Sequence, residues 1–385
     1  MTAGIRPCPV CGGHDLIAGP SAENVPAHAV RLIYDRASAL AEPRGTIALA
    51  YCQTCGFAFN SAFEASLVTY DAAYESTQTH SQTFSHYMRD LVADLDARAA
   101  GPGAVLDVGC GQGEFLAAFA KISDRPLIGV DPALDFSRSQ VAGATLIPAV
   151  FKASDVTDHV ALITCKMTLE HVVDPVGLMR EIALCASRSA ETLVFLQVPN
   201  AAHIYERTLF ADIIYEHVNY FTEPALRTAC ARAGLEVIET FVTYSDQHLG
   251  LLARAGGGAD IAPTAPDTAQ FEGFRTRLEA TVTKAREALT ALIATGRRPI
   301  IWGAGSKAVA FLNFTGLEQA IDWSIDINPL KRGTYLPGSA IPIFLPDEAD
   351  FASVTDVVVM NPLYRDEIAA TLRSFGASPD LHLVD

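Results

Sequence analysis

The feature that most constrains the fold is a glycine-rich turn within residues 104–121, in the stretch AVLDVGCGQGEFLAAFAK. The apolar run before the turn is short and contains β-branched residues, as in a buried strand, and the segment after it has the periodicity of an amphipathic helix. PLIGVD follows as a second strand and ends in Asp131. Because strand, helix and strand alternate, we predict an α/β fold with a parallel, doubly wound sheet.

The turn itself indicates a ligand site. Gly109, Gly111 and Gly113 would let a ligand approach the backbone closely at the N-terminus of the helix. Asp131 is placed to accept hydrogen bonds from ribose hydroxyls, and Asp107 stands two residues before the first glycine. The compact GxGxG turn lacks the spacing preferred around a pyrophosphate. The stretch therefore resembles motif I of the class I S-adenosylmethionine (SAM)-dependent methyltransferases, and a purely structural turn or an NAD-binding turn is the alternative.

Four of the eight cysteines form two CxxC pairs, CPVC and CQTC, and a glycine follows each pair. Glycine at this place is typical of knuckles in which backbone N–H groups point at sulfur. Two such pairs suit a tetrahedral structural zinc ion, so we expect its ligands to be Cys8, Cys11, Cys52 and Cys55. A disulfide pair is the rival interpretation, which a cytoplasmic chain disfavours. The loop between the pairs must carry its own strands, which we place around HAVRLIYD and TIALAYC.

The composition narrows the classes of function. At 385 residues the chain is long enough for two or three domains. No apolar run approaches the roughly 18 residues of a membrane span, and the N-terminus shows no signal-peptide pattern. We expect a cytoplasmic protein with no membrane partner, either a monomer or a small homo-oligomer. The net charge of −16 has no basic run to offset it, so nucleic acid is not expected as a partner.

Three domains are predicted: a zinc-binding module at residues 1–70, a SAM-dependent methyltransferase domain at 71–255, and a C-terminal part at 256–385. The methyltransferase sheet should end in the paired strands LEVIETFVTY and LGLLARA. The stretch GGGADIAPTAPDTAQ has no periodicity and marks the clearest boundary. A long helix from about Phe271 to Thr295 should follow it. PIIWGAGSKAVAFLN then opens a second Rossmann-like unit, whose GxGxxA turn either holds a nucleotide or is only a tight connection.

The order of the motifs is more specific than any one of them. Two CxxC pairs, the SAM turn, TLEHVVDP, YEHVNYF, WGAGSKA and PGSAIPIFLP follow one another over nearly the whole chain. This order resembles the three-domain, zinc-containing sugar C-methyltransferases, which methylate a carbon next to the ketone of nucleotide-linked 4-keto deoxysugars. The resemblance implies SAM as methyl donor, a structural zinc ion and a nucleotide-linked keto sugar as the small-molecule acceptor. It also implies a role in deoxysugar and natural-product biosynthesis.

This chemistry requires a base near the acceptor carbon and a hydrogen-bond donor at the developing enolate oxygen. By resemblance, His217 matches the proposed base of the family, Glu216 its neighbouring essential acid, and His171 a histidine at the mouth of the same pocket. Tyr74 stands where the family has a pocket tyrosine. A histidine with an ordinary pKa of about 6.5 is mostly neutral at pH 7 and suits the role of base. In an extended strand Glu216 and His217 would point to opposite faces, so either the stretch turns or only one of them faces the acceptor.

The chain departs from the family within this stretch. The family reads roughly Tyr-His-Glu-His where this chain has Ile214, Tyr215, Glu216 and His217, so an apolar residue replaces the first tyrosine. Tyr215 and Tyr220 are the candidates to supply the missing hydroxyl. If neither does, the acceptor differs. The alternative function is then SAM-dependent methylation of an oxygen, nitrogen or carbon acid of another small molecule.

Each catalytic candidate also has a structural interpretation. His171 could cap or pack the helix that begins near Pro175, Glu216 could be a solvated acid, and Glu170 is interpreted as structural. Ala161 stands where many methyltransferases carry an aspartate, which weakens the match. Two hypotheses of other classes are a zinc module fused to a non-catalytic SAM sensor and a C-terminal NAD-dependent oxidoreductase. The intact SAM turn and the lack of a basic zinc face argue against the sensor, and we expect no NAD binding by the C-terminal part.

Overall fold

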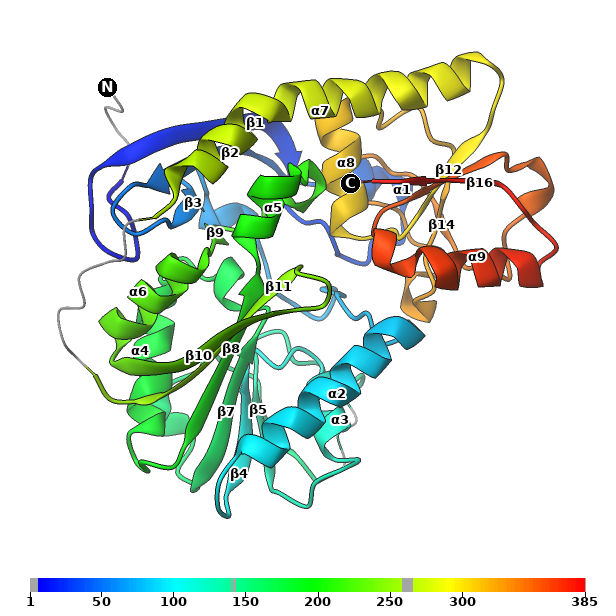
Figure 1. The fold of residues 1–385 in the computed structure, drawn as a ribbon. Coiled ribbons are helices and arrows are strands. Elements are labelled where there is room, and N and C mark those ends of the chain that lie inside the picture. The colour runs from blue at the N-terminus through cyan, green and yellow to red at the C-terminus, as the bar shows by residue number, and fades with distance from the viewer. Residues whose placement is uncertain (1–5, 140, 142, 258–265, 385) are drawn as a thin grey trace.

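The computed structural model describes residues 6–139, 141, 143–257 and 266–384, which form three β-sheets and the helices around them (Figure 1). Most of the predicted linker GGGADIAPTAPDTAQ lies outside these described residues. Within them, none of the helices combines the length and the apolar character that a membrane crossing requires.

The seven-stranded sheet carries the first glycine turn. Its strands in spatial order are β10 (Leu235–Thr243), β11 (His248–Ala255), β8 (Leu193–Pro199), β7 (Val160–Lys166), β4 (Ala104–Val108), β5 (Leu127–Val130) and β6 (Thr145–Ile147). The last five of these are parallel, and β11 is antiparallel to both of its neighbours. The doubly wound sheet and its terminal strand pair are therefore confirmed.

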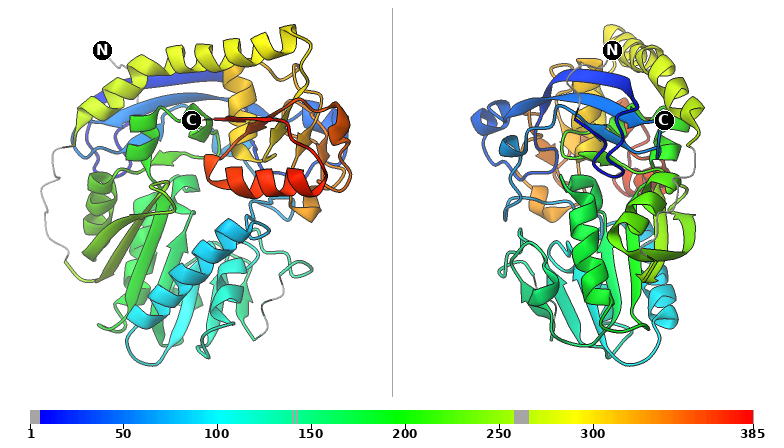
Figure 2. Two further views of the ribbon diagram at one scale, coloured as in Figure 1. Left: turned by 45° about the vertical axis from the view of Figure 1, so that its right-hand side comes forward. Right: turned by 90° about the vertical axis from the view of Figure 1, so that its left-hand side faces the viewer.

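Helices cover both faces of this sheet (Figures 1 and 2). α2 (Gln82–Arg98) and α3 (Glu114–Phe119) pack on one face, and α4 (Pro175–Ala186) and α6 (Glu223–Ala233) pack on the other. Successive residues of β4 alternate between the two cores, because Val105 packs with α2 and α3 while Leu106 packs with α4 and α6. The strand that precedes the glycine turn is therefore buried on both sides, which explains its uninterrupted apolar sequence.

The N-terminal sheet differs from the prediction. It has the order β1 (Leu16–Pro26), β2 (Arg44–Cys52), β3 (Ala58–Asn60) and β9 (Asn219–Tyr220), and all of its pairings are antiparallel. The predicted strand TIALAYC lies in β2, but the predicted strand HAVRLIYD does not form. Its backbone N–H groups at His28 and Ala29 donate to the carboxylates of Glu42 and Glu216 instead of to a neighbouring strand. The short helix α1 (Arg36–Leu40) follows this irregular segment.

The C-terminal part is a second Rossmann-like unit, as predicted. Five parallel strands lie in the order β14 (Ile343–Phe344), β13 (Ser324–Ile325), β12 (Pro299–Trp302), β15 (Asp356–Val359) and β16 (Asp380–Leu383), with helices α8 (Ser306–Thr315) and α9 (Arg365–Ser374). Single-turn helices occur along the whole chain: η1 (Ala65–Leu67), η2 (Ala153–Asp155), η3 (Leu169–His171), η4 (Phe210–Asp212), η5 (Pro329–Lys331), η6 (Phe351–Ser353) and η7 (Pro362–Tyr364).

The N-terminal and C-terminal sheets share one apolar core. The long helix α7 (Thr268–Ala294), close to its predicted limits, packs on β1, α8 and α5 (Ala201–Arg207). Its Phe271 and Phe274 belong to the same cluster as Ile47 of β2 and Phe311 of α8. The two sheets therefore lie together on one side of the methyltransferase sheet (Figure 2), with the glycine turns of both Rossmann-like units facing the space between.

Candidate active site

A cavity of about 690 Å³ runs between the methyltransferase sheet and the other two sheets. Its lining begins at the first glycine turn, continues past His171 and His217, and ends at the second glycine turn near Gly303. Ligand sites of proteins commonly have volumes of about 300–1,000 Å³ and lie where domains meet. One continuous space therefore joins the two ends of a candidate active site.

The predicted cofactor residues gather at the first end. Gly109, Gly111 and Gly113 have φ angles of +75°, +55° and +91°, which side-chain-bearing residues rarely adopt. A Cβ atom on Gly109 would lie 2.2 Å from Oγ1 of Thr168, so the turn also needs glycine for space. Asp107, Gly109, Gly111 and Asp131 line the cavity, whereas Gly113 caps the start of α3. The cradle fits a ligand that lies directly against the backbone.

The two acids of this end are held differently. The carboxylate of Asp131 accepts hydrogen bonds from the backbone N–H groups of Gly111, at 2.9 Å, and Ala133, at 2.7 Å. Asp107 is buried and accepts a hydrogen bond of 2.6 Å from Oγ1 of Thr164, and burial raises its pKa to about 6. Asp131 therefore fixes the shape of the turn, whereas Asp107 links the strand before the turn to Thr164 of β7. Both acids line the cavity.

Lys166 is a charged residue of this region that sequence analysis missed. It ends β7 and lines the cavity, with its Nζ atom 5.9 Å and 5.6 Å from the ring centroids of Phe84 and Phe115. Burial lowers the pKa of Lys166, and Asp107 is the strongest of the acids that oppose this effect. A charged group is therefore buried in the wall of the cavity.

The catalytic candidates come together at the middle of the cavity. His217 donates its backbone N–H to the carbonyl of Ile214 at 3.2 Å, so the stretch turns there and both Glu216 and His217 line the cavity. Val218 donates to the carbonyl of Glu170 at 2.8 Å, which fastens this turn to η3. The rings of His171 and His217 then form a T-shaped contact, with their centroids 4.9 Å apart.

Burial sets the protonation of this group. It lowers the pKa of His171 to about 4 and lowers that of His217 well below its ordinary value. It raises the pKa of Glu216 to about 7 and that of Glu170 to about 8. Both imidazoles are therefore neutral at pH 7, and Nδ1 of His217 finds no hydrogen-bond partner among the described residues. A neutral imidazole is the form that can accept a proton.

The tyrosines fall into two groups. Tyr74 and Tyr70 line the cavity next to His171, and the Tyr70 hydroxyl lies 3.0 Å from His171 Nδ1. Tyr215, a catalytic candidate, does not line the cavity, because its hydroxyl accepts the backbone N–H of Glu64 at 2.9 Å under the N-terminal sheet. Tyr220 is also turned away and donates to the carbonyl of Ile214 at 3.3 Å. Sequence analysis missed Tyr70, which lies in a loop outside every motif of the sequence.

The four predicted metal ligands form one cluster. The Sγ atoms of Cys8 and Cys55 lie 3.7 Å apart, those of Cys11 and Cys52 lie 3.5 Å apart, and all four are within 4.8 Å of one another. A disulfide would require about 2.05 Å, whereas the edge of a tetrahedron with metal–sulfur bonds of about 2.3 Å is about 3.8 Å. Gly12 and Gly56 have φ angles of +75°, as knuckle turns require. The cluster could hold a metal ion.

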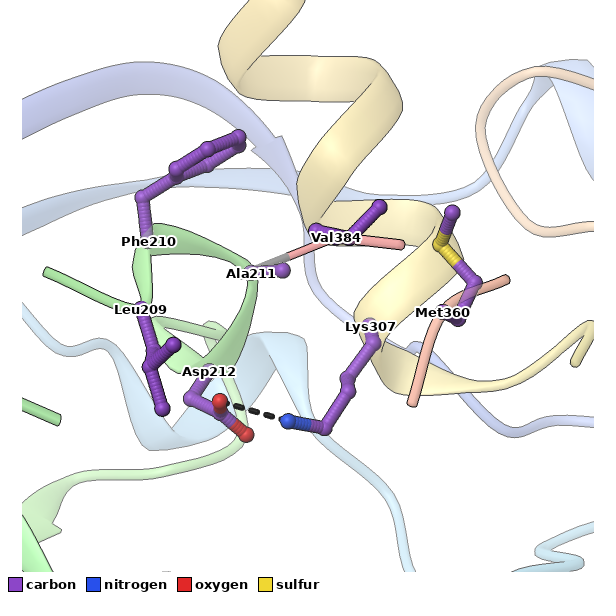
Figure 3. A pocket seen from close by; sticks show the side chains of 7 residues that line it. All are labelled: Leu209, Phe210, Ala211, Asp212, Lys307, Met360 and Val384. Atoms are coloured by element: carbon purple, nitrogen blue, oxygen red, sulfur yellow. Dashed lines mark hydrogen bonds and ion pairs between the residues drawn. The ribbon is translucent and has the colours of Figure 1, made fainter. Parts of the chain in front are cut away.

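The second glycine turn is occupied by charged side chains of the same chain. Nζ of Lys331 donates to the carbonyl of Ala304 at 2.8 Å and to the carboxylate of Asp326 at 2.7 Å. At the start of α8, Lys307 reaches across to Asp212 of η4 at 2.6 Å, at a small pocket between the two elements (Figure 3). Both lysines also line the large cavity, each beside its acidic partner.

Two successive parts of the chain match known protein families. Residues 79–240 match the family described as a methyltransferase domain, and residues 262–379 match the family described as a C-methyltransferase C-terminal domain. The C-methyltransferase NovU of Streptomyces niveus is 27% identical over 377 residues, covering 90% of this chain and 87% of that protein.

Among solved structures, a SAM-dependent methyltransferase from Clostridium acetobutylicum is 11% identical, with a TM-score of 0.36 over 45% of this chain and 92% of that chain. The 1,6-didemethyltoxoflavin-N1-methyltransferase of Burkholderia thailandensis is 16% identical, with a TM-score of 0.34 over 46% of this chain and 81% of that chain. The chain is therefore a SAM-dependent methyltransferase, and it is similar to a C-methyltransferase over most of its length.

Proposed function

We propose that the enzyme methylates a carbon next to the ketone of a nucleotide-linked deoxysugar. The observation that carries this proposal is the position of His217, a neutral imidazole in the wall of the cavity that also contains the SAM turn. A carbon acid needs such a base, because carbon next to a ketone becomes nucleophilic only after it loses a proton. The similarity to a C-methyltransferase is consistent with carbon as the methylated atom.

The residues of the chain divide this chemistry between them. Asp131 and the glycine turn would hold SAM, which when bound supplies the methyl group. His217 would take the proton from the acceptor carbon, and the hydroxyls of Tyr70 and Tyr74 would face the enolate oxygen that develops. His171 keeps its proton on Nδ1, because that atom lies 3.0 Å from the carbonyl of Glu216, which can only accept. His171 would therefore position Tyr70 and the turn rather than compete for the substrate proton.

The far end of the cavity would receive the nucleotide. Lys331 and Lys307 line it next to the second glycine turn, in a chain whose net charge is −16. The oxygens of a diphosphate would replace the carboxylates of these lysines' acidic partners and would pair with the two ammonium groups instead. Asn361 and Tyr364, at the two ends of η7, add polar groups to the same wall. The sugar of the acceptor would thus lie in the middle of the cavity and its nucleotide at the far end.

The cysteine cluster would bind a structural zinc ion, with the zinc-binding module at residues 1–70, the methyltransferase domain at 71–255 and the C-terminal part at 256–385. Four thiolates leave no open position for catalysis. The cluster shares a core with α6 through Phe57 and Phe221. We propose that zinc acts by holding β2 and β3, to whose edge the segment after His217 is paired.

One observation supports a second candidate acceptor. Ile214 lines the cavity, at the position where the sugar enzymes carry a tyrosine. An apolar wall there would suit a different carbon acid, or an oxygen or nitrogen acceptor, on a less polar small molecule.

The test is to incubate the pure protein with SAM and a panel of nucleotide-linked 4-keto sugars in deuterated buffer. Mass spectrometry scores methyl gain and deuterium uptake separately. We expect methyl gain on one sugar and its loss in His217→Ala, with SAM binding retained. Bound SAM with neither methyl gain nor deuterium uptake on any sugar would contradict the proposal and favour the second acceptor class.

A further inference from the structure

Glu170 is a fully buried acid whose carboxyl group makes no hydrogen bond to the described part of the chain. It is 0% exposed, and neither carboxyl oxygen finds a hydrogen-bond partner among the described residues. Its main chain, by contrast, accepts the N–H of Val218 at 2.8 Å and so fastens the catalytic turn. Buried polar groups without partners are rare and costly. A buried carboxyl group without partners, next to a candidate active site, therefore indicates a functional role rather than a role in stabilising the fold.

The neighbours of Glu170 point to one partner. One carboxyl oxygen and one nitrogen of each imidazole, His171 and His217, all lie within 4.8 Å of one another. His171 already uses Nδ1 toward the carbonyl of Glu216 and the hydroxyl of Tyr70. His217 has a buried Nδ1 with no partner in the described part of the chain. Glu170 therefore lies close to two imidazoles, and His217 is the one whose Nδ1 lacks a partner among the described residues.

We infer that Glu170 is a positioning residue for His217, whose carboxylate receives the N–H of that imidazole while the ring holds the proton of the acceptor. This inference rests on the proposed function of His217 as base. The atoms are farther apart than a hydrogen bond, as catalytic contacts often are before the substrate binds. In the inferred reacting state a change of side-chain rotamer closes this distance.

Electrostatics explains why the base needs this acid. A protonated His217 would otherwise be a buried cation near Lys307, whose charge already lowers its pKa. An ionised Glu170 converts that cation into a neutral pair. Burial raises the pKa of Glu170 to about 8, and Lys166 works against this rise. The other titratable groups around Glu170 are His171, Cys165, Tyr70 and Tyr74.

The reaction then balances as follows. The C–H bond of the acceptor breaks, its electron pair remains on the enolate, and the proton passes to His217. The enolate pair forms the new carbon–carbon bond to the methyl group of SAM, whose sulfur keeps the electrons of the broken bond. The proton stays on the pair of Glu170 and His217 until it leaves to solvent. No further oxidant, reductant or co-reactant is required.

The pH dependence of methyl transfer tests the inference in Glu170→Gln, which keeps the shape of the side chain and removes its charge. In the wild type kcat should rise with pH up to about 8, as Glu170 ionises. In Glu170→Gln we expect kcat about 10- to 100-fold lower and independent of pH over that range. The melting temperature should not fall, because the side chain makes no bond in the fold.

Asp356→Asn is the matched control, since Asp356 is also a buried acid but lies in the C-terminal sheet, paired with Arg297 and His382. Its loss should lower the melting temperature and leave the shape of the pH profile unchanged. Glu170→Asp, which keeps the charge on a shorter side chain, should retain the rise with pH at a reduced kcat. An unchanged kcat and pH profile in Glu170→Gln would overturn the inference.

A second measurement needs no acceptor. In ¹⁵N-histidine spectra of the free protein, the signal of His217, identified by its loss in His217→Gln, should shift near pH 8 as Glu170 ionises. A His217 signal whose chemical shift does not change near pH 8 would also overturn the inference. If the wild type neither exchanges nor methylates any keto sugar, the proposed function fails, while the spectra still decide whether Glu170 and His217 are coupled.

Discussion

The backbone N–H of Ala29 donates to the Glu216 carboxylate at 2.9 Å, although 187 positions separate the two residues in sequence. The irregular segment that follows β1 is thereby fastened to the acid that precedes the candidate base. The pairing of Phe59 with Asn219 fastens the other end of the same turn. Contacts with N-terminal residues thus hold the turn at residues 214–217 at both of its ends.

Replacing Glu216 separates its charge from its anchoring role. Glu216→Gln keeps an oxygen for the N–H of Ala29, so the fold should be retained. Glu216→Ala leaves that buried N–H without a partner and should lower the free energy of unfolding by about 1–3 kcal/mol. Urea unfolding of both variants measures this difference. Equal stability of the two variants would show that the contact does not hold the turn.

Removal of the metal should affect catalysis more than cofactor binding. Loss of the ion from the Cys8, Cys11, Cys52 and Cys55 cluster would loosen β2 and β3, and with them the segment after His217. The SAM turn lies in a different sheet. We expect one zinc ion per chain by elemental analysis, and in Cys55→Ser a large loss of methyl transfer with SAM affinity nearly kept. Parallel loss of both would contradict this separation.

The first glycine of the SAM turn should tolerate no side chain. Gly109→Ala would place Cβ 2.2 Å from Oγ1 of Thr168 at a φ angle of +75°. Gly234→Ala is the control, because its φ angle is +85° and a Cβ there meets nothing within 4 Å. Both substitutions strain the backbone by about 1 kcal/mol. Calorimetric titration should therefore find SAM binding abolished in Gly109→Ala alone.

Stability should fall with rising pH between about pH 6.5 and 8 in the protein without SAM. The folded-state pKa of Glu170 is raised from 4.5 to about 8, so its contribution is present at low pH and is lost as the pH rises through 8. His171, lowered from 6.5 to about 4, has the opposite effect but only below pH 6.5. Glu216, with its pKa raised to about 7, adds to the loss up to pH 7. Glu170 alone should lower the free energy of unfolding by up to about 1.4 kcal/mol per pH unit. Glu170→Gln should flatten this slope, and a slope unchanged by the substitution would contradict the raised pKa.

Local patterns made much of the fold predictable. The glycines of the SAM turn need positive φ angles, the CxxC pairs need knuckles, and β4 is apolar because both of its faces are buried. The sequence LEVIETFVTY alternated and paired as expected. In each case the constraint lies within a few consecutive residues.

The parts that could not be predicted depend on distant contacts. β1 contains Pro20, Ser21 and Glu23 and is a strand only because β2 pairs with it. Tyr215 is turned away from the cavity because its hydroxyl accepts the backbone N–H of Glu64, which lies 151 positions away in the sequence. Lys166 and Glu170 each look ordinary in sequence, and only the burial of both beside the same cavity distinguishes them.

The central claim is that His217 removes a proton from carbon, and α-proton exchange measures that step alone. The enzyme is saturated with S-adenosylhomocysteine in place of SAM, so that no methyl group can transfer, and the acceptor identified by the sugar panel is followed by NMR in deuterated buffer. We predict exchange in the wild type and a rate at least about 100-fold lower in His217→Gln. Equal exchange rates in the two proteins would contradict the account.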